Sequence, residues 1–157
     1  MAKNTVRVIL IILLCCTFSI IFGFSSQTGT KSAGISRKIT EIITSNIKSI
    51  QEKNEIEKEQ ILSNVEHIIR KLAHFSIYAL VGMLVMLLCK TYNLKNLDRI
   101  AITMIISIIY ATSDEIHQIF VNGRGPMFAD VLIDTFGAFV GMNVVLVCSQ
   151  IKKALNK

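Results

Sequence analysis

The chain has 157 residues, of which 52% are hydrophobic, and its formal net charge is +6. Its apolar residues fall into four blocks of about 17–22 residues, the length that a helix needs to cross roughly 30 Å of hydrocarbon. This pattern excludes an ordinary soluble domain, and sheet is not expected because an open sheet edge cannot be satisfied in lipid. The sequence therefore predicts an all-α fold, an integral membrane bundle of four transmembrane helices that forms a single domain over residues 1–157.

The first apolar block covers about residues 6–24 and follows two basic residues, Lys3 and Arg7. A basic flank before an apolar run is also typical of a signal peptide. However, this run is longer than the roughly 7–15 residues of a signal-peptide core, and no A-x-A-like cleavage site follows it. We therefore expect an uncleaved anchor helix.

Residues 25–71 form the sizeable polar segment of the chain. Within it, apolar residues from Ile35 to Ile50 and again from Ile61 to Leu72 recur with helical spacing. Such spacing is typical of one face of an amphipathic helix. We expect helices that lie on the membrane surface or pack over the mouth of the bundle. A docking surface for a partner protein is the alternative.

Three further spans are predicted at about residues 72–88, 100–121 and 128–149. Pro126 suits the first turn of the last helix. In that helix Gly137 and Gly141 form a GxxxG motif, which permits two helices to approach closely. The motif is equally compatible with packing inside one bundle and with packing between two copies, so the oligomeric state stays open.

Lysine and arginine predict the orientation of the bundle, because short cytoplasmic segments carry an excess of these residues. If both termini are inside the cell, the cytoplasmic side holds a set of basic residues and a single acid, Asp98. The basic residues are Lys3, Arg7, Lys90, Lys95, Arg99, Lys152, Lys153 and Lys157. We therefore expect a multi-pass protein of the cell membrane with cytoplasmic N- and C-termini and with the segment 25–71 outside the cytoplasm.

Polar and charged residues lie inside or at the edges of the predicted spans. A charge at membrane depth costs roughly 2.5–3.5 kcal/mol on insertion scales, so such residues usually have a function. Helical spacing places most of them on single faces of three spans: Lys71, His74 and Tyr78; Tyr110, Asp114, His117 and Gln118; Asp130 and Asp134. The topology brings these faces to the extracytoplasmic end, together with Glu115, Arg124, Ser25 and Gln27. We therefore expect an outward-facing polar pocket.

Two interpretations of this pocket involve no catalysis. In the first, Lys71 and Arg124 only neutralise the four acids and hold the bundle together. In the second, the pocket binds a ligand, and Arg124 captures a phosphate or carboxylate. The expected ligand-binding residues are Lys71, Tyr78, Gln118, Arg124, Asp130, Asp134, Ser25 and Gln27.

A third interpretation is a membrane enzyme, a hydrolase or transferase. Burial and like-charge crowding separate the pKa values of neighbouring groups, which suits general acid–base catalysis. Asp114 or Glu115 would act as the base, and His74 or His117 as the acid. The sequence thus leaves open whether the protein is an enzyme.

No cofactor and no metal site is predicted, because the chain lacks a recognised spacing such as HExxH or CxxC. The combination of Asp, Glu and His nevertheless leaves a divalent cation as an open alternative. Nucleic acid is not an expected partner, because the basic residues flank membrane spans.

Three segments of the chain resemble a known family. They are FSSQTGTKSAGIS after the first span, RKLAHFSIYALVG at the second, and SDEIHQIFVNGRGPMFADVLIDTFGAFVG across the third and fourth. On these segments the chain resembles the VanZ-like family of small bacterial membrane proteins; Asn122-Gly123 departs from the Pro-Gly expected before Arg124. The matching motif residues are Ser25, Gln27, Lys71, His74, Tyr78, Asp114, Glu115, Gln118, Arg124, Asp130, Asp134 and Gly137.

The resemblance implies a link to reduced susceptibility to teicoplanin-type glycopeptides, because the family takes its name from a protein of glycopeptide-resistance clusters. Together with the predicted pocket, it favours a protein that binds or handles an amphiphile of the cell envelope. The expected partners are membrane lipids, a lipid-linked envelope precursor or a lipoglycopeptide. The alternatives are the enzyme described above and a scaffold whose segment 35–70 docks a partner.

Overall fold

The structure, a computed structural model, describes residues 3–125 and 127–156. It contains six helices: α1 (Lys3–Ser25), α2 (Gly29–Thr44), α3 (Lys48–Gln51), α4 (Glu55–Lys90), α5 (Asn96–Gln118) and α6 (Phe128–Leu155). No strand occurs in the described ranges. Four helices, α1, α4, α5 and α6, are long and apolar enough to cross a membrane. The predicted all-α membrane bundle is confirmed, and Pro126 lies outside the described residues.

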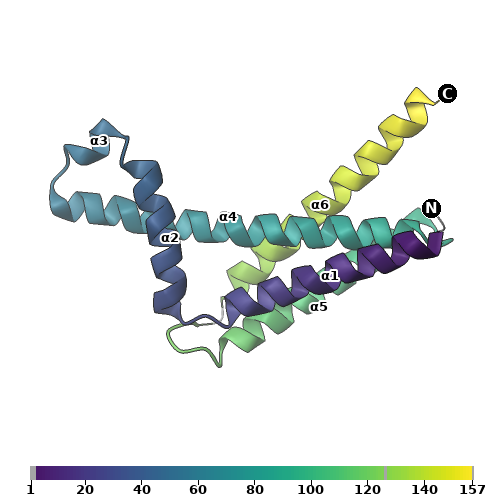
Figure 1. Cartoon of the computed structure of the whole chain (residues 1–157), viewed down its shortest axis with the longest axis horizontal. Helices are drawn as coiled ribbons and strands as arrows, with labels where there is room; N and C mark the ends of the chain where they lie inside the picture. Colours follow the sequence, from purple (N-terminus) through teal and green to yellow (C-terminus); the bar gives the residue numbers. More distant parts are fainter. Residues whose placement is uncertain (1–2, 126, 157) are drawn as a thin grey trace.

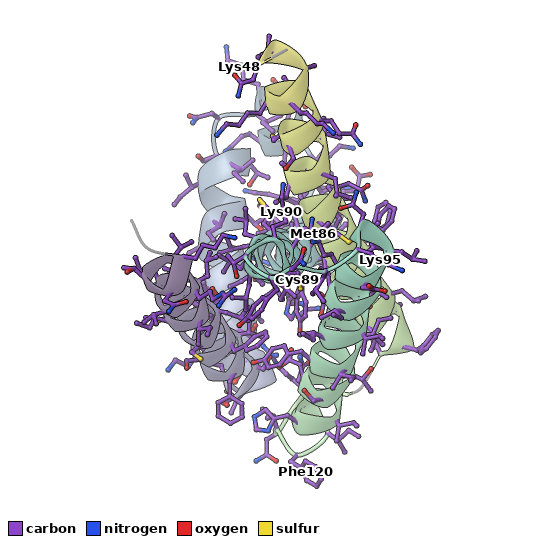
Figure 2. The ribbon with its side chains drawn as sticks, turned by 90° about the vertical axis from the view of Figure 1, so that its right-hand side faces the viewer. Lys48, Met86, Cys89, Lys90, Lys95 and Phe120 are labelled. Carbon is purple, nitrogen blue, oxygen red and sulfur yellow. The ribbon has the colours of Figure 1, made fainter. Side chains whose placement is uncertain are left out.

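Helix α4 is the central element of the bundle. It contacts α1, α2, α5 and α6, and in the view from the end near Lys90 it lies between α1 and α5 (Figure 2). Helix α1 ends, α5 ends and α6 begins near Ser25, Gln118 and Phe128, which we call the polar end of the bundle (Figure 1). The opposite, basic end contains Arg7 and Lys90.

Helix α4 is continuous over 36 residues, whereas the sequence suggested an outer amphipathic helix followed by a separate span. Asn54 begins the helix, because its side chain accepts a hydrogen bond from the Glu57 backbone N–H at 2.9 Å. The negative charges of Glu55 and Glu57 in the first turn interact favourably with the positive end of the helix dipole. No Gly or Pro lies between Gln51 and Gly82 to break it.

Glycines let α6 cross α4 at close range. A Cβ atom added at Gly137 or Gly141 would meet the α4 backbone at Phe75 or Ala79, and one at Gly82 would meet the backbone of Ala138. The GxxxG motif therefore packs inside this bundle. This crossing carries the N-terminal turns of α6 to the polar half of α4, while the last turns of α6 project away from the other helices (Figure 1).

Helix α2 packs against α4 through hydroxyl side chains. Ser36, Thr40 and Thr44 are its buried residues, and the two threonine hydroxyls donate to carbonyl oxygens one turn earlier. The serine and threonine side chains are small, and their hydroxyls are satisfied on the helix itself. This face is therefore suited to close packing. The predicted isoleucine face points elsewhere, and Ile42 is 71% exposed.

An exposed ion pair also joins α2 to α4. The Arg37 guanidinium donates two hydrogen bonds of 2.7 Å to the Glu59 carboxylate and one of 3.0 Å to Glu41. These carboxylates raise the pKa of Arg37 above its usual range. The pair adds a contact between α2 and the first turns of α4.

Helix α5 ends at Gln118, before the predicted end of the third span at Val121. The backbone N–H groups of residues 119–121 each donate to the carbonyl three residues earlier, which tightens the chain into a turn. The chain then reaches Gly123, whose φ of 76° lies in the left-handed region that favours glycine. The third span is therefore shorter than predicted, and the loop to α6 begins after Gln118.

Candidate functional site

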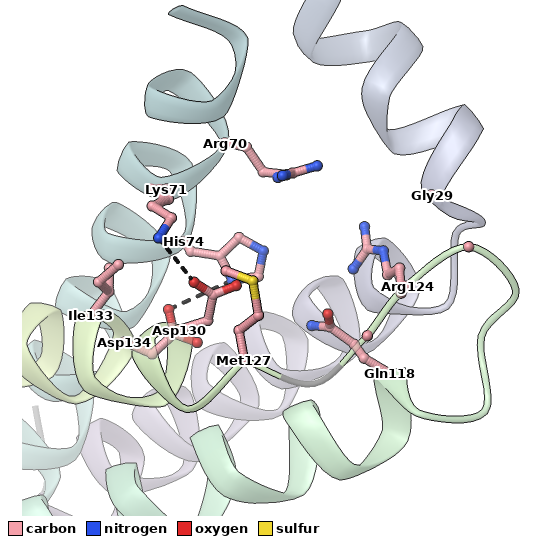
Figure 3. A pocket seen from close by; sticks show the side chains of 12 residues that line it. Gly29, Arg70, Lys71, His74, Gln118, Arg124, Met127, Asp130, Ile133 and Asp134 are labelled. Atoms are coloured by element: carbon pink, nitrogen blue, oxygen red, sulfur yellow. Dashed lines mark ion pairs between the residues drawn. The ribbon is translucent and has the colours of Figure 1, made fainter. Parts of the chain in front are cut away.

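A polar cavity of about 190 Å³ lies at the polar end, between α4, α6 and the loop that joins α5 to α6 (Figure 3). Several predicted site residues line it, and Arg70 joins them. The lining residues are Gly29, Arg70, Lys71, His74, Gln118, Gly123, Arg124, Gly125, Met127, Asp130, Ile133 and Asp134. The structure thus brings together residues that are distant in the sequence.

An ion pair and a histidine–carboxylate contact across the α4–α6 crossing form one wall of the polar cavity. Lys71 Nζ lies 3.5 Å from Asp130 Oδ1, and His74 Nδ1 lies 3.5 Å from Asp134 Oδ1. Helical spacing explains the arrangement, because Lys71 and His74 are about one turn apart on α4, and Asp130 and Asp134 are about one turn apart on α6. Asp134 is completely buried, whereas Lys71, His74 and Asp130 are each about a quarter exposed.

Asp114 is buried beside α1. Its Oδ2 atom accepts a hydrogen bond of 2.8 Å from Ser25 Oγ and one of 3.3 Å from Gln118 Nε2. These contacts join the ends of α1 and α5 and explain why polar residues occur at both helix ends. The carboxylate forms no ion pair with a lysine or arginine of the described residues.

Glu115 holds the loop before α6. Its Oε2 atom accepts a 2.9 Å hydrogen bond from the Met127 backbone N–H, and the carboxylate is buried. Glu115 therefore positions the start of α6, next to Asp130, and it does not line the polar cavity.

The structure does not bring His117, Gln27 or Tyr78 to the wall of the polar cavity. His117 stacks on Phe22 with ring centroids 4.5 Å apart, and its Nε2 lies 3.0 Å from Ser26 Oγ. Tyr78 is fully buried one turn along α4 from His74, and its hydroxyl has no hydrogen-bond partner in the part of the chain that the structure describes.

Arg70 and Arg124 reach into the space above His74 from opposite sides (Figure 3). Among residues 3–125 and 127–156, neither guanidinium forms an ion pair with a carboxylate. Arg124 donates one long hydrogen bond, 3.5 Å from Nη2 to the Phe24 carbonyl oxygen. Burial lowers the pKa of the Arg124 guanidinium, and repulsion from Arg70 lowers it further. The guanidinium stays charged, because an arginine pKa begins far above neutrality.

A contact between two glycines positions Arg124. The Gly29 N–H at the start of α2 donates to the Asn122 carbonyl oxygen at 3.1 Å. A Cβ atom at Gly29 would meet the Gly123 carbonyl. The close approach of these backbones ties the α1–α2 connection to the loop that carries Arg124.

A second, apolar cavity of about 190 Å³ adjoins the first between α1, α2 and α4. Its walls are mainly aliphatic and aromatic, and Ser25 and Gln27 lie at its edge. The apolar lining residues are Ile21, Phe24, Ile35, Ile39, Ile69, Ala73 and Ile77. The two cavities share Arg70, His74 and Arg124. The site is therefore a charged chamber beside an apolar one.

Sequence reasoning missed Arg70 and the role of α2. Arg70 precedes Lys71 in the motif RKLAHF, so the two neighbouring basic residues were visible in the sequence. Whether the Arg70 side chain points toward the α5–α6 loop depends on how α4 is rotated about its axis, which the sequence does not show. Ile35 and Ile39 were predicted on an amphipathic face, and only the packing of α2 on α4 shows that they border a cavity.

Comparison with protein-family models shows that the family described as VanZ/LLP1 matches residues 10–149. This range includes the helices and the connections that form both cavities. Comparisons with curated proteins and with solved structures find no match.

Proposed function

The chain belongs to the VanZ/LLP1 family, and from this membership and the two adjoining cavities we propose that it binds an anionic amphiphile of the cell envelope. The polar head occupies the polar cavity, and an apolar chain occupies the apolar cavity. The observation that carries this proposal is the set of three residues, Arg70, His74 and Arg124, that border both cavities.

The polar cavity suits an anionic head group. Arg70 and Arg124 face the same space without carboxylate partners among the described residues. Two like charges so placed repel each other, and an anion between them removes that cost. Arginine binds phosphate and carboxylate in a bidentate geometry. Lys71 is already paired with Asp130, so its contribution to binding is smaller.

The apolar cavity suits an aliphatic chain. Isoleucines from α1, α2 and α4 line it, and burial of apolar surface contributes roughly 25 cal/mol per Å². A ligand that has both a charged head and an apolar chain gains from both cavities. A free phosphate would gain only from the first.

The polar end faces the outside of the cell in this proposal, with both termini in the cytoplasm. The support is the asymmetry of basic residues, because cytoplasmic segments are rich in lysine and arginine. At the basic end Arg7 donates hydrogen bonds to Thr91 and lies 4.2 Å from the centroid of the Tyr92 ring. An extracytoplasmic site has access to lipid-linked envelope precursors, anionic lipid heads and lipoglycopeptides.

Sequestration of such a ligand is how the protein would contribute to glycopeptide resistance of the teicoplanin type. A teicoplanin-type lipoglycopeptide itself carries a polar body and an acyl chain. Its acyl chain suits the apolar cavity, whereas the polar cavity of about 190 Å³ has room for only a small part of its polar body. A lipid-linked precursor has the same two parts, so both ligands compete for the site.

A membrane enzyme is the second candidate, and the contact between His74 and Asp134 favours it. A carboxylate close to an imidazole is a common arrangement for general acid–base catalysis, and Asp134 Oδ1 lies 3.5 Å from His74 Nδ1. Here His74 would transfer a proton at the head group. Asp114 and Glu115 are engaged by Ser25, Gln118 and Met127, so the structure offers Asp134 as the partner of the histidine.

The proposal is tested with Ile39→Trp, which fills the apolar cavity, and with Ile42→Trp as the matched control on the exposed side of α2. Native mass spectrometry of the purified protein measures retention of phosphatidic acid and of diacylglycerol with the same chains. The unsubstituted protein is expected to prefer phosphatidic acid at least tenfold. Ile39→Trp should lower its retention, and Ile42→Trp should leave it unchanged.

Equal retention of the two lipids by the unsubstituted protein would contradict a charged head-group chamber. Equal effects of the two tryptophan variants would contradict a chain in the apolar cavity. Monodispersity in detergent confirms that each variant is folded before the comparison is made.

A further inference from the structure

His74, Asp114 and Asp134 come from three different helices and converge beside the polar cavity. We propose that one imidazole nitrogen and one oxygen of each carboxylate bind a single divalent transition-metal ion, Zn²⁺ or Mn²⁺. This inference does not rest on the proposed function, because the ion is bound by the protein alone.

The distances fit ligands of one small ion. A donor atom of each residue lies within 4.8 Å of the others. His74 Nδ1 and Asp134 Oδ1 are 3.5 Å apart. Two ligands at about 2.0–2.2 Å from a tetrahedral ion are separated by roughly 3.5 Å. That pair therefore already has the separation that a shared ion requires.

The burial of Asp134 is the independent indication of a missing partner. Its side chain is 0% exposed, and neither carboxylate oxygen accepts a hydrogen bond from residues 3–125 or 127–156. An isolated buried carboxylate is costly. His74 is its charge partner only when the imidazole is protonated. A divalent ion would neutralise both Asp134 and Asp114.

Ser25 and Gln118 hold Asp114 in an orientation suited to an ion. Both donate to Oδ2, which leaves the other carboxylate oxygen for coordination. Partners of this kind orient metal ligands, and their loss commonly weakens metal binding about 10–100-fold. The cavity side of His74 and Asp134 provides room for water or a head group as a further ligand.

The donor set favours a transition metal over Mg²⁺ and Ca²⁺. Imidazole nitrogen suits Zn²⁺ and similar ions, whereas Mg²⁺ and Ca²⁺ prefer oxygen ligands alone. Mn²⁺ accepts carboxylates well and is visible by electron paramagnetic resonance. It therefore serves as a spectroscopic probe of the same site.

The test is a titration of the purified chain in detergent. Binding of Mn²⁺ is measured by electron paramagnetic resonance, and binding of Zn²⁺ is measured by elemental analysis after dialysis. One ion per chain is expected, with at least tenfold weaker binding in Asp134→Asn and His74→Gln. Ser25→Ala should weaken binding about tenfold through Asp114. His67→Gln and His117→Gln, the other two histidines, are the matched controls and should bind as the unsubstituted chain does.

The absence of stoichiometric binding by the unsubstituted chain would overturn the proposal, and that result needs no variant to fold. Binding lost in His117→Gln but kept in His74→Gln would also overturn it, as would displacement of Mn²⁺ by equimolar Ca²⁺. A rise of the unfolding midpoint with Zn²⁺ that Asp134→Asn lacks would support it. Lipid retention can fail in all these proteins without affecting this result.

Discussion

Replacing Arg124 by alanine is expected to weaken retention of phosphatidic acid by roughly 10- to 150-fold, which corresponds to about 1.5–3 kcal/mol for hydrogen bonds to a charged group. Arg124 borders both cavities and has no carboxylate partner among the described residues. Its charge is therefore free to bind the head group. Native mass spectrometry with phosphatidic acid measures the loss.

Arg99→Ala is the control for the loss of one positive charge. Arg99 lies in the first turn of α5, at the basic end, where it donates to Asn96 and to the Tyr92 carbonyl. Its replacement should leave phosphatidic acid retention unchanged. If Arg124→Ala instead lowers the amount of folded protein in the membrane, Arg124 serves the stability of the bundle, and the binding role is contradicted.

Replacing Gly141 by leucine is expected to destabilise the bundle by roughly 2 kcal/mol or more, since overpacking in a well-packed core typically costs about 1–3 kcal/mol and occasionally more. Even a Cβ atom at Gly141 would meet the α4 backbone at Ala79. The backbone cannot move aside as a flexible side chain can. The two helices must separate, and the contact between His74 and Asp134 is then lost.

Gly23→Leu is the matched control, because a Cβ atom at Gly23 of α1 meets nothing within 4 Å. Thermal unfolding in detergent measures both variants. We expect a lower midpoint for Gly141→Leu and little change for Gly23→Leu. Similar midpoints for the two variants would show that the crossing of α4 and α6 is looser than the structure indicates.

The sequence was sufficient to predict the four apolar helices and the gathering of polar residues at one end. Both follow from local patterns: long apolar blocks define the helices, and helical spacing places Lys71 with His74 and Asp130 with Asp134 on shared faces. Antiparallel connectivity then brings Ser25, Asp114 and Asp134 to one depth. These inferences need no knowledge of how the helices rotate against each other.

Helix rotation and crossing decided what the sequence could not predict. His117 shares a helical face with Asp114, and both residues contact α1, where His117 stacks on Phe22 and lies outside the lining of the polar cavity. Arg70 seemed to be only a neighbour of Lys71, but the direction of α4 points it toward Arg124. The pairing of His74 with Asp134 depends on glycine contacts whose partner helix the GxxxG motif alone does not identify.

The apolar cavity was also beyond reach from the sequence. The regular isoleucines of residues 35–50 predicted one face of an amphipathic helix that lies on the membrane surface or packs over the mouth of the bundle. The hydroxyl face of Ser36, Thr40 and Thr44 packs instead, because its groups are satisfied within α2. This rotation leaves Ile35 and Ile39 in the lining of the apolar cavity, which Arg124 also borders.

The most direct test of the central claim is photo-crosslinking with phosphatidic acid that carries a diazirine in one acyl chain, with the protein in a lipid bilayer. The proposed site predicts labelling of Ile35, Ile39, Ile69 and Ile77, which unlabelled phosphatidic acid suppresses and Arg124→Ala reduces. Labelling that falls instead on outward-facing residues such as Ile108 and Ile109, without competition, would contradict a two-part amphiphile site.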